Sequence, residues 1–278
     1  EDMGYSNGFW PGDKDEQSEA YANCATGDYL WQIDIDEFYK TDDIESIISL
    51  IRNEPGISQL NVFQYNFWGS LDTLVDGLFL RHFYGELQGV PRIFEWGKGY
   101  KYITHRPPTV IDAEGKDTRQ GIWIRGNELA NMNIQCYHYA TVFPQAVEWK
   151  MKYYQTMGWS NQGNFVKWYN SEFKSIQKPF RVHHAINHIS WLKPFHGSHP
   201  DQIKLLMGDI ETGVVNTHHR HRDDIKKLLG SRRYQLGVLF MSYCWDLFIR
   251  IRRAPRLSAL VFKAFEILFS PKIIKNQN

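Results

Sequence analysis

The sequence is poor in cysteine, nearly neutral in charge and without long apolar runs. Its three cysteines, Cys24, Cys136 and Cys244, are far apart and form no C-x-x-C pair, which argues against a disulfide framework and a zinc site. Basic and acidic residues number 32 and 31, and this balance excludes a bulk nucleic-acid binder and a disordered acidic protein. No stretch of about 18 uncharged apolar residues occurs, so we expect no membrane-spanning helix.

We expect no signal peptide at the beginning of the given sequence. It starts with glutamate rather than methionine, and we expect the chain to be a fragment or a processed product. Three reduced thiols are typical of a reducing compartment. These features favour a cytoplasmic protein, bound peripherally to the inner face of the membrane if it is membrane-attached.

Charge is distributed unevenly along the chain. Residues 218–278 hold 13 basic and 4 acidic residues, a net charge of +9, whereas residues 1–217 hold 19 and 27, a net charge of −8. We therefore expect an acidic globular body followed by a basic tail.

Helical and extended patterns alternate through the first quarter of the chain. Residues 15–25 favour a short helix, and residues 29–36 favour a buried strand that ends in carboxylates. Asp42 begins a second helix, with Glu45 placed as in a capping box, and residues 60–68 form a second strand. This alternation predicts an α/β fold with a mainly parallel sheet flanked by helices. Further patterns indicate strands at 90–94, 100–104 and 134–139 and a helix at 144–157.

The sharpest feature is the acidic run Asp34-Ile35-Asp36-Glu37 at the end of the first predicted strand. Residues two apart in a strand point the same way, so Asp34 and Asp36 are expected to converge at the rim of the sheet, where ligands of α/β proteins bind. Converging carboxylates repel each other unless a cation lies between them, and oxygen ligands favour Mg²⁺ or Mn²⁺ bridged to a phosphate. The residues alone therefore indicate a divalent metal that holds a phosphorylated ligand. The alternative is a solvated strand-to-helix turn.

Other motifs with the same acidic core fit less well. An EF-hand loop from Asp34 would end correctly at Glu45, but Phe38 and Tyr39 occupy the third-ligand and glycine positions. An aspartyl-phosphate phosphatase would use Asp34 as its nucleophile, although the expected Gly-Thr is Glu37-Phe38 here. No G-x-x-x-x-G-K-[ST] stretch is present, which excludes a P-loop enzyme by motif.

The segment around the acidic run resembles the family-2 glycosyltransferases of the GT-A fold. It has Asn23-Cys24-Ala25 in the predicted helix, then Gly27-Asp28-Tyr29, then an apolar strand that ends in Asp34-Ile35-Asp36-Glu37-Phe38. Within the family, the segment is most similar to the bacterial branch that has a D-x-D-E-F motif. Weaker likeness continues at residues 67–69, 92–94, 102–108 and 138–154, so the resemblance covers about residues 1–160.

The resemblance implies an inverting, metal-dependent glycosyltransferase that moves a sugar from a nucleotide-sugar to a glycan or lipid-linked acceptor. In this family the D-x-D acids bind a divalent cation, Mn²⁺ or Mg²⁺, clamped to the diphosphate of the donor. Asp36 would be the direct metal ligand, Asp34 would contact the nucleotide side as well, and His138 would add an imidazole to the metal. Lys14 and Gln17 would belong to the nucleotide-sugar site.

Inversion also requires an acidic side chain that deprotonates the acceptor hydroxyl. The family often takes this base from an acidic motif well after the D-x-D. The corresponding part of this chain holds no Glu-Asp pair, and its acids are Glu95, Asp112, Glu114, Asp117 and Glu128. We expect Glu95 to be the base because it follows a predicted strand, with Asp112 and Glu128 as alternatives.

The predicted domain organisation follows from the same resemblance. The family normally has a strand, a helix and another strand before the segment seen here, and we expect these first strands to be missing. Residues 1–145 would form the catalytic domain, residues 146–217 a mixed helical extension, and residues 218–278 a basic amphipathic helical tail. The tail suits either a membrane surface or two helices that close over the domain.

Several histidines and tryptophans have two interpretations. Residues 183–188 hold three histidines without the acid of a zinc hydrolase motif, so a structural role is expected, and residues 218–222 are expected to form a solvated basic loop. Trp68, Trp96 and Trp123 either stack on sugar rings or pack in the core.

Two further functions stay open, namely a phosphohydrolase or phosphotransferase with Asp34 as nucleophile and a non-catalytic, membrane-attached sugar-binding protein.

Overall fold

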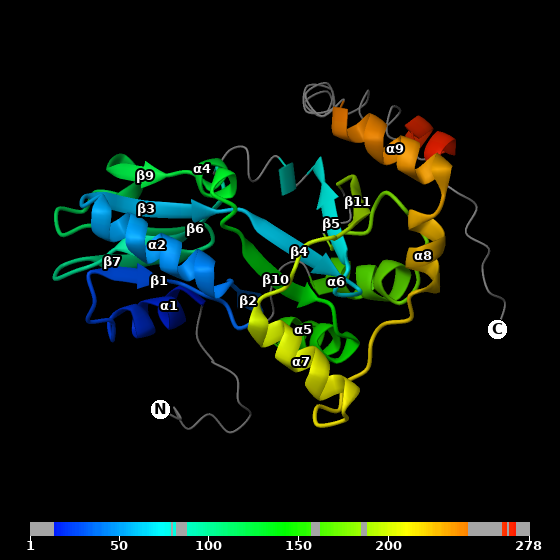
Figure 1. Cartoon of the computed structure of the whole chain (residues 1–278), viewed down its shortest axis with the longest axis horizontal. Helices are drawn as coiled ribbons and strands as arrows, with labels where there is room; N and C mark the ends of the chain where they lie inside the picture. Colours follow the sequence, from blue (N-terminus) through cyan, green and yellow to red (C-terminus); the bar gives the residue numbers. More distant parts are fainter. Residues whose placement is uncertain are drawn as a thin grey trace. The chain divides into compact units, whose positions relative to one another are not determined.

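The computed structural model describes residues 14–78, 80–81, 88–156, 162–184, 188–243, 263–265 and 267–270. Helices and strands are mixed along this part of the chain (Figure 1), which confirms the predicted α/β class. The strands are β1 (Tyr29–Trp31), β2 (Glu37–Phe38), β3 (Ile57–Val62), β4 (Gln64–Trp68), β5 (Thr73–Gly77), β6 (Val90–Glu95), β7 (Lys101–His105), β8 (Pro108–Ile111), β9 (Ile122–Ile124), β10 (Cys136–Thr141) and β11 (Ser190–Pro194). The α-helices are α1 (Lys14–Ala22), α2 (Thr41–Asn53), α4 (Gly126–Asn131), α5 (Pro144–Thr156), α6 (Gln162–Trp168), α7 (Asp201–Glu211), α8 (Asp223–Leu229) and α9 (Arg232–Tyr243).

Two sheets and one hairpin hold the strands together. The four-stranded sheet has the order β1-β6-β3-β9, the five-stranded sheet has the order β11-β5-β4-β10-β2, and β7 pairs with β8. β3 and β9 run parallel, whereas β6 runs antiparallel to both β1 and β3. The pairs β2–β10, β4–β5 and β5–β11 are also antiparallel. The predicted mainly parallel sheet is therefore not confirmed, because short connections such as the one from β4 to β5 favour antiparallel neighbours over helical crossovers.

The chain departs from prediction around the acidic run. The strand predicted at residues 29–36 ends at Trp31, and the chain turns at residues 34–37, where the Glu37 amide donates to the Asp34 carbonyl at 2.9 Å. The predicted capping box is also wrong, because α2 begins at Thr41 and its N-cap residue is Lys40, whose side chain offers no acceptor.

The chain folds into two compact units, each built from three separate stretches of sequence. The first unit comprises Glu1–Tyr65, Phe83–His138 and His199–Leu205, and the second comprises Asn66–His82, Tyr139–Ser198 and Leu206–Asn278. Each unit combines distant stretches because pairing between distant strands groups the chain differently from its order along the sequence. The predicted functional regions 1–145, 146–217 and 218–278 stay a prediction.

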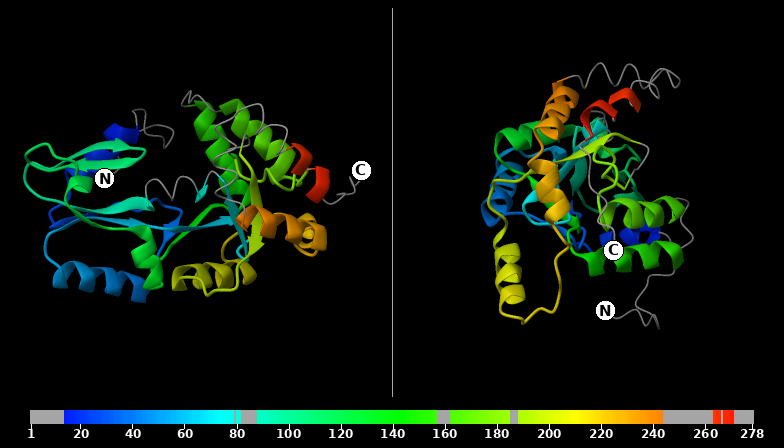
Figure 2. Two further views of the ribbon diagram at one scale, coloured as in Figure 1. Left: turned by 90° about the horizontal axis from the view of Figure 1, so that it is seen from above. Right: turned by 90° about the vertical axis from the view of Figure 1, so that its right-hand side faces the viewer.

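In the first unit, the four-stranded sheet is covered on both faces. Ile93 and Phe94 are adjacent in β6, so their side chains point to opposite faces. Ile93 packs in one cluster with Ile47 of α2, whereas Phe94 packs with Ala22 of α1 and Tyr102 of β7. Figure 2 shows α2 on one side of this sheet and α1 with the β7–β8 hairpin on the other. The turn after β1 is therefore anchored at the edge of a sheet that is packed on both sides.

The second unit has an aromatic core. Trp68 and Trp168 are almost completely buried, and both indole nitrogens donate to the carbonyl of Val182, at 3.0 and 2.6 Å. Tyr234 of α9 is also buried, and its hydroxyl accepts the Leu192 amide at 2.7 Å. Hydrogen bonds thus fix the polar atoms of large apolar side chains in this core.

Candidate functional site

The acidic run lies in the turn that joins β1 to β2 in the first unit. The side chains of Asp34 and Asp36 are 37% and 27% exposed, and Ile35 between them is 99% exposed. The two carboxylates are therefore accessible to a ligand, although they stand in a turn rather than at the end of a regular strand.

Arg92 of β6 fixes the inner side of this turn. Its buried guanidinium donates to Asp34 Oδ2 at 3.3 Å and to Glu37 Oε1. Glu37 is also buried; it accepts Gln64 Nε2 at 2.5 Å and the Asp34 amide at 3.3 Å. Glu37 is thus the structural member of the acidic run, which leaves Asp34 and Asp36 as the accessible ones.

The surrounding charges keep Asp34 ionised. Burial disfavours its charged form and Asp36 repels it. Arg92, Lys14 and, in the acidic range where Asp34 itself titrates, protonated His105 outweigh both effects and hold the pKa of Asp34 below its ordinary value. For Arg92, burial disfavours the charged guanidinium, but the carboxylates of Glu37 and Asp34 outweigh this effect and raise the pKa of Arg92. Arg92 therefore stays protonated at any pH at which the protein is folded.

Pairing of β2 with β10 brings His138 to the acidic turn. His138 lies opposite Glu37 in the strand register, and His138 Nε2 is 3.5 Å from Asp36 Oδ1. The structure thus places His138 beside Asp36, and the charge of Asp36 acts on Asp34. The metal role of the three residues stays a prediction. Across the residues that the structure describes, no group of three or more histidine, cysteine, aspartate or glutamate side chains is arranged so that it could hold a metal ion. A cation here would therefore complete its coordination with ligand or water oxygens.

A second polar cluster adjoins Asp34 on the side of α1 and β7. Ser18 Oγ lies 2.9 Å and Gln32 Nε2 lies 3.3 Å from His105 Nδ1, and the Tyr102 hydroxyl donates to Gln32 Oε1. Burial and the nearby cations Lys14, Arg106 and Arg92 outweigh the attraction of Asp34 and lower the pKa of His105 to about 4. His105 is therefore a neutral hydrogen-bonding group at neutral pH.

Lys14 and Gln17, predicted to bind the nucleotide-sugar, both lie on α1 and are partly buried. The charge of Lys14 acts on both Asp34 and His105, which places this lysine beside the acidic turn. The position of Lys14 suits a contact with an anionic ligand.

The three predicted bases do not lie with Asp34 and Asp36. Glu95 pairs with Tyr29 at the start of β1, the end away from the acidic turn. Asp112 accepts the amides of Glu114 and Lys116 in the turn after β8, and Glu128 caps α4 through the Arg125 amide at 2.7 Å. Glu95 was expected because it follows a predicted strand. In the antiparallel pairing of β1 with β6, the end of β6 lies at the start of β1, away from the acidic turn.

The tryptophans singled out from the sequence are mostly core residues. Trp68 and Trp96 are buried, and Trp123 is half-buried, with the Arg125 guanidinium 5.5 Å from the ring centroid. His183 is buried as well, and its amide donates to Ser190 Oγ at 2.9 Å. These contacts support the structural interpretation for Trp68, Trp96 and His183.

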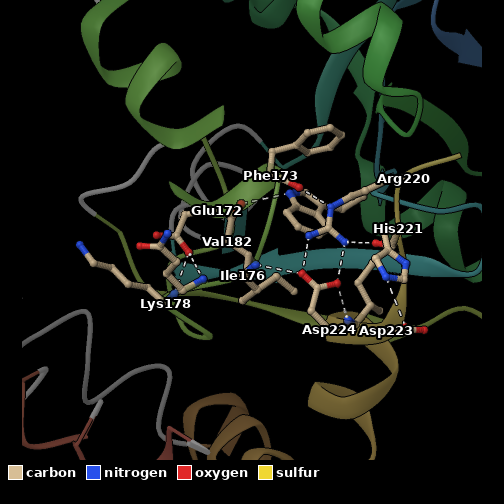
Figure 3. Close-up of polar contacts among 12 residues, drawn as sticks. Glu172, Phe173, Ile176, Lys178, Val182, Arg220, His221, Asp223 and Asp224 are labelled. Carbon is tan, nitrogen blue, oxygen red and sulfur yellow. Dashed lines mark hydrogen bonds and ion pairs between the residues drawn. The ribbon is translucent and has the colours of Figure 1, made fainter. Parts of the chain in front are cut away.

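The basic loop at residues 218–222 is solvated, as expected, at His218, His219 and His221, but not at Arg220. Arg220 is buried, and its guanidinium donates to both carboxylate oxygens of Asp224, at 2.7 and 2.5 Å, and to the Phe173 carbonyl (Figure 3). It also lies 4.9 Å from the centroid of the Trp68 ring. Arg220 is thus a packed residue of the second unit that donates hydrogen bonds from all three guanidinium nitrogens, while His221 beside it is exposed.

Sequence reasoning missed three residues of the candidate site, namely Gln32, Arg92 and His105. Arg92 and His105 lie in two segments that share the resemblance described above, but no local pattern shows that an arginine in an apolar strand pairs with an acid far away in the sequence. Gln32 is only two residues before Asp34, and its role appears once the hairpin β7–β8 is placed beside it.

Comparisons with known proteins identify no relative. No family model, no curated protein and no solved structure matches the chain. Among the described helices, none is both long and apolar enough to cross a membrane.

Proposed function

We propose that the chain is an inverting, metal-dependent glycosyltransferase that acts on a nucleotide-sugar and a glycan or lipid-linked acceptor, within a GT-A-like arrangement. The observation that carries this proposal is the accessible turn in which Asp36 lies 3.5 Å from His138, with Asp34 beside it. An exposed pair of acids next to an imidazole suits a site that gains a cation together with its ligand.

The side chains available as metal ligands suit the expected metal. Asp36 and His138 would hold Mn²⁺ or Mg²⁺, and the mixed set of one carboxylate and one imidazole suits Mn²⁺ better, because Mg²⁺ is bound mainly through oxygen. When bound, the cation would stabilise the negative charge on a departing nucleoside diphosphate. Asp34, ionised and held by Arg92, would accept hydrogen bonds from the nucleotide, and Lys14 would attract its phosphates.

Binding of nucleotides tests the proposal without a known acceptor. Titration calorimetry of the full chain with UDP and with GDP, each with and without Mn²⁺, is expected to detect Mn²⁺-dependent binding. Asp36→Asn should weaken this binding by about tenfold or more, and His138→Ala should weaken it as well. Asp42→Asn, which alters an exposed aspartate of α2, is the matched control and should bind like the unaltered chain.

The result can also exclude the proposal. Binding that ignores Mn²⁺, or binding that Asp36→Asn leaves unchanged, would contradict the assignment. A beryllofluoride adduct on Asp34 would instead favour the phosphotransfer alternative, in which Asp34 is the nucleophile.

A further inference from the structure

Helix α9 in the second unit is apolar on two opposite faces. Tyr234, Gly237 and Met241 form the inner face and are buried. The inner face packs closely, because a methyl group at Gly237 would come within 2.7 Å of both Phe180 and Phe269 side-chain atoms. This face explains how α9 is attached to its own unit.

The outer face of α9 presents large apolar side chains to solvent. Leu236 is 60% exposed, Leu239 is 51% exposed and Tyr243 is 83% exposed. These residues follow the i, i+3, i+7 spacing of one helical face. Ile267 and Leu268 extend this surface, since Arg233 of α9 donates to the carbonyls of both. Figure 1 shows the short segment around residues 263–270 beside α9. We call the exposed residues Leu236, Leu239, Phe240, Tyr243, Ile267 and Leu268 the outer apolar surface.

Among the described residues of α9 and of the segments 263–265 and 267–270, the charged side chains are all basic. They are Arg232, Arg233 and Lys263, and all three are exposed. The sequence from 232 to 268 holds seven basic residues and two acidic residues, Asp246 and Glu266. A helix that is apolar on two faces is expected to bury both of them, so a second surface should contact the outer face. The basic residues beside this face favour a contacting surface that is negatively charged.

We propose that the outer apolar surface and its basic edge dock on the surface of an anionic phospholipid bilayer. Leucine, phenylalanine and tyrosine side chains would enter the boundary between headgroups and acyl chains, and the arginines and lysine would lie at the phosphates. An apolar surface that binds a second copy of the chain would instead juxtapose these like charges. The proposal does not depend on the glycosyltransferase function.

Vesicle flotation of the full chain tests this docking surface. Vesicles of phosphatidylcholine with about one third phosphatidylglycerol should carry the chain to the top of the gradient, and vesicles of phosphatidylcholine alone should carry much less. High salt should weaken the binding, because screening removes the electrostatic attraction.

Two variants separate the apolar and electrostatic contributions. Leu236→Glu/Leu239→Glu should weaken binding to anionic vesicles by about tenfold or more. Arg232→Glu/Lys263→Glu should also weaken it by about tenfold or more, since each basic residue near an anionic surface contributes roughly fivefold. The control is Leu205→Glu, which alters an exposed leucine of α7, and it should bind like the unaltered chain. Circular dichroism shows whether each variant is folded; if the leucine variant unfolds, the charge variant decides.

Three results would overturn the proposal. The unaltered chain would fail to float with anionic vesicles, or both surface variants would bind as it does. Alternatively, light scattering would show a dimer that Leu236→Glu/Leu239→Glu dissociates while no vesicle binding occurs, which would assign the outer apolar surface to a second copy of the chain.

Discussion

Arg92 is the residue on which the shape of the acidic turn depends. Its buried charge is balanced by Glu37, which is buried as well, and by Asp34 at the surface. A buried ion pair contributes little net stability compared with apolar residues, but removal of one partner leaves an uncompensated charge in the interior. The pair therefore ties the accessible carboxylate of Asp34 to the core of the first unit.

Arg92→Met should lower the free energy of unfolding by about 3–5 kcal/mol, because Glu37 would remain buried without its cation. Urea denaturation followed by circular dichroism measures the change. The double variant Arg92→Met/Glu37→Met removes both charges and should be more stable than Arg92→Met alone. A double variant less stable than the single one would show that the ion pair is not the reason for the loss.

Glu172 is a second buried acid, and it makes stability depend on pH. Its carboxylate accepts the amides of Gln177 and Lys178, at 3.1 and 2.7 Å (Figure 3). Burial outweighs these hydrogen bonds and raises its pKa to about 7 from an ordinary value of 4.5. Between these two values the folded chain holds a proton that the unfolded chain has released.

The contribution of Glu172 to stability should therefore be full below pH 4.5 and fall as the pH rises to 7, by up to about 3 kcal/mol. Glu172→Gln cannot ionise and keeps the acceptor oxygen, so its advantage over the unaltered chain should grow across this interval. Denaturation midpoints of both proteins at a series of pH values measure the difference. A constant difference would mean that Glu172 does not titrate in this range.

At the scale of elements, β5 and β11 approach each other too closely for any side chain at Gly77. A methyl group there would lie 2.6 Å from the Ile189 carbonyl oxygen and 2.7 Å from Ser190 Cα, both backbone atoms. Gly208 in α7 has no atom within 4 Å of the corresponding position. The two glycines thus differ in what surrounds them.

Gly77→Ala should destabilise the second unit by about 1–3 kcal/mol, because the backbone of β11 must shift. Gly208→Ala is the comparison and should stabilise the chain by roughly 0.5–1 kcal/mol through better helix propensity. Thermal unfolding of the two variants gives the sign of each change. A Gly77→Ala variant as stable as the unaltered chain would mean that the backbone of β11 can shift without a cost in stability.

The elements most readily predicted from sequence were those with strong local patterns. The helix expected at residues 144–157 corresponds to α5, and the strand expected at 90–94 corresponds to β6. The direction of strand pairing was not predictable in this way, because it depends on which strands meet. The strand expected at 29–36 was too long because Glu37 turns inward to Arg92, and a contact between residues so far apart leaves no local signal.

The candidate site shows the same division. Asp34 and Asp36 stand out in the sequence because an acidic pair after an apolar run is rare without a purpose. The sequence could not show which acid lies near the site, because strand register and local capping hydrogen bonds determine the positions of Glu95, Asp112 and Glu128. His138 was identified through a resemblance, and the pairing of β2 with β10 gives its position a physical reason.

At the scale of the whole molecule, opposite charges are separated along a nearly neutral chain. Near pH 7.9 the chain has no net charge, yet its basic tail should retain it on a cation-exchange resin. Arg232→Glu/Lys263→Glu and Lys98→Glu/Lys101→Glu change the net charge equally, and the tail variant should elute at lower salt than the other. Equal elution would show that retention does not depend on the tail.

The three-stretch composition of the first unit has a consequence for synthesis. When synthesis reaches residue 145, the residues of β2 and β10 have been added to the chain, but His199–Leu205, which also belong to the first unit, have not. Pairing between segments so distant in sequence is slow to form, and synthesis proceeds more slowly than local helices fold. The acidic turn would therefore exist on the ribosome before its histidine neighbour reaches it, and a chain cut after residue 145 would carry the turn in an incomplete unit.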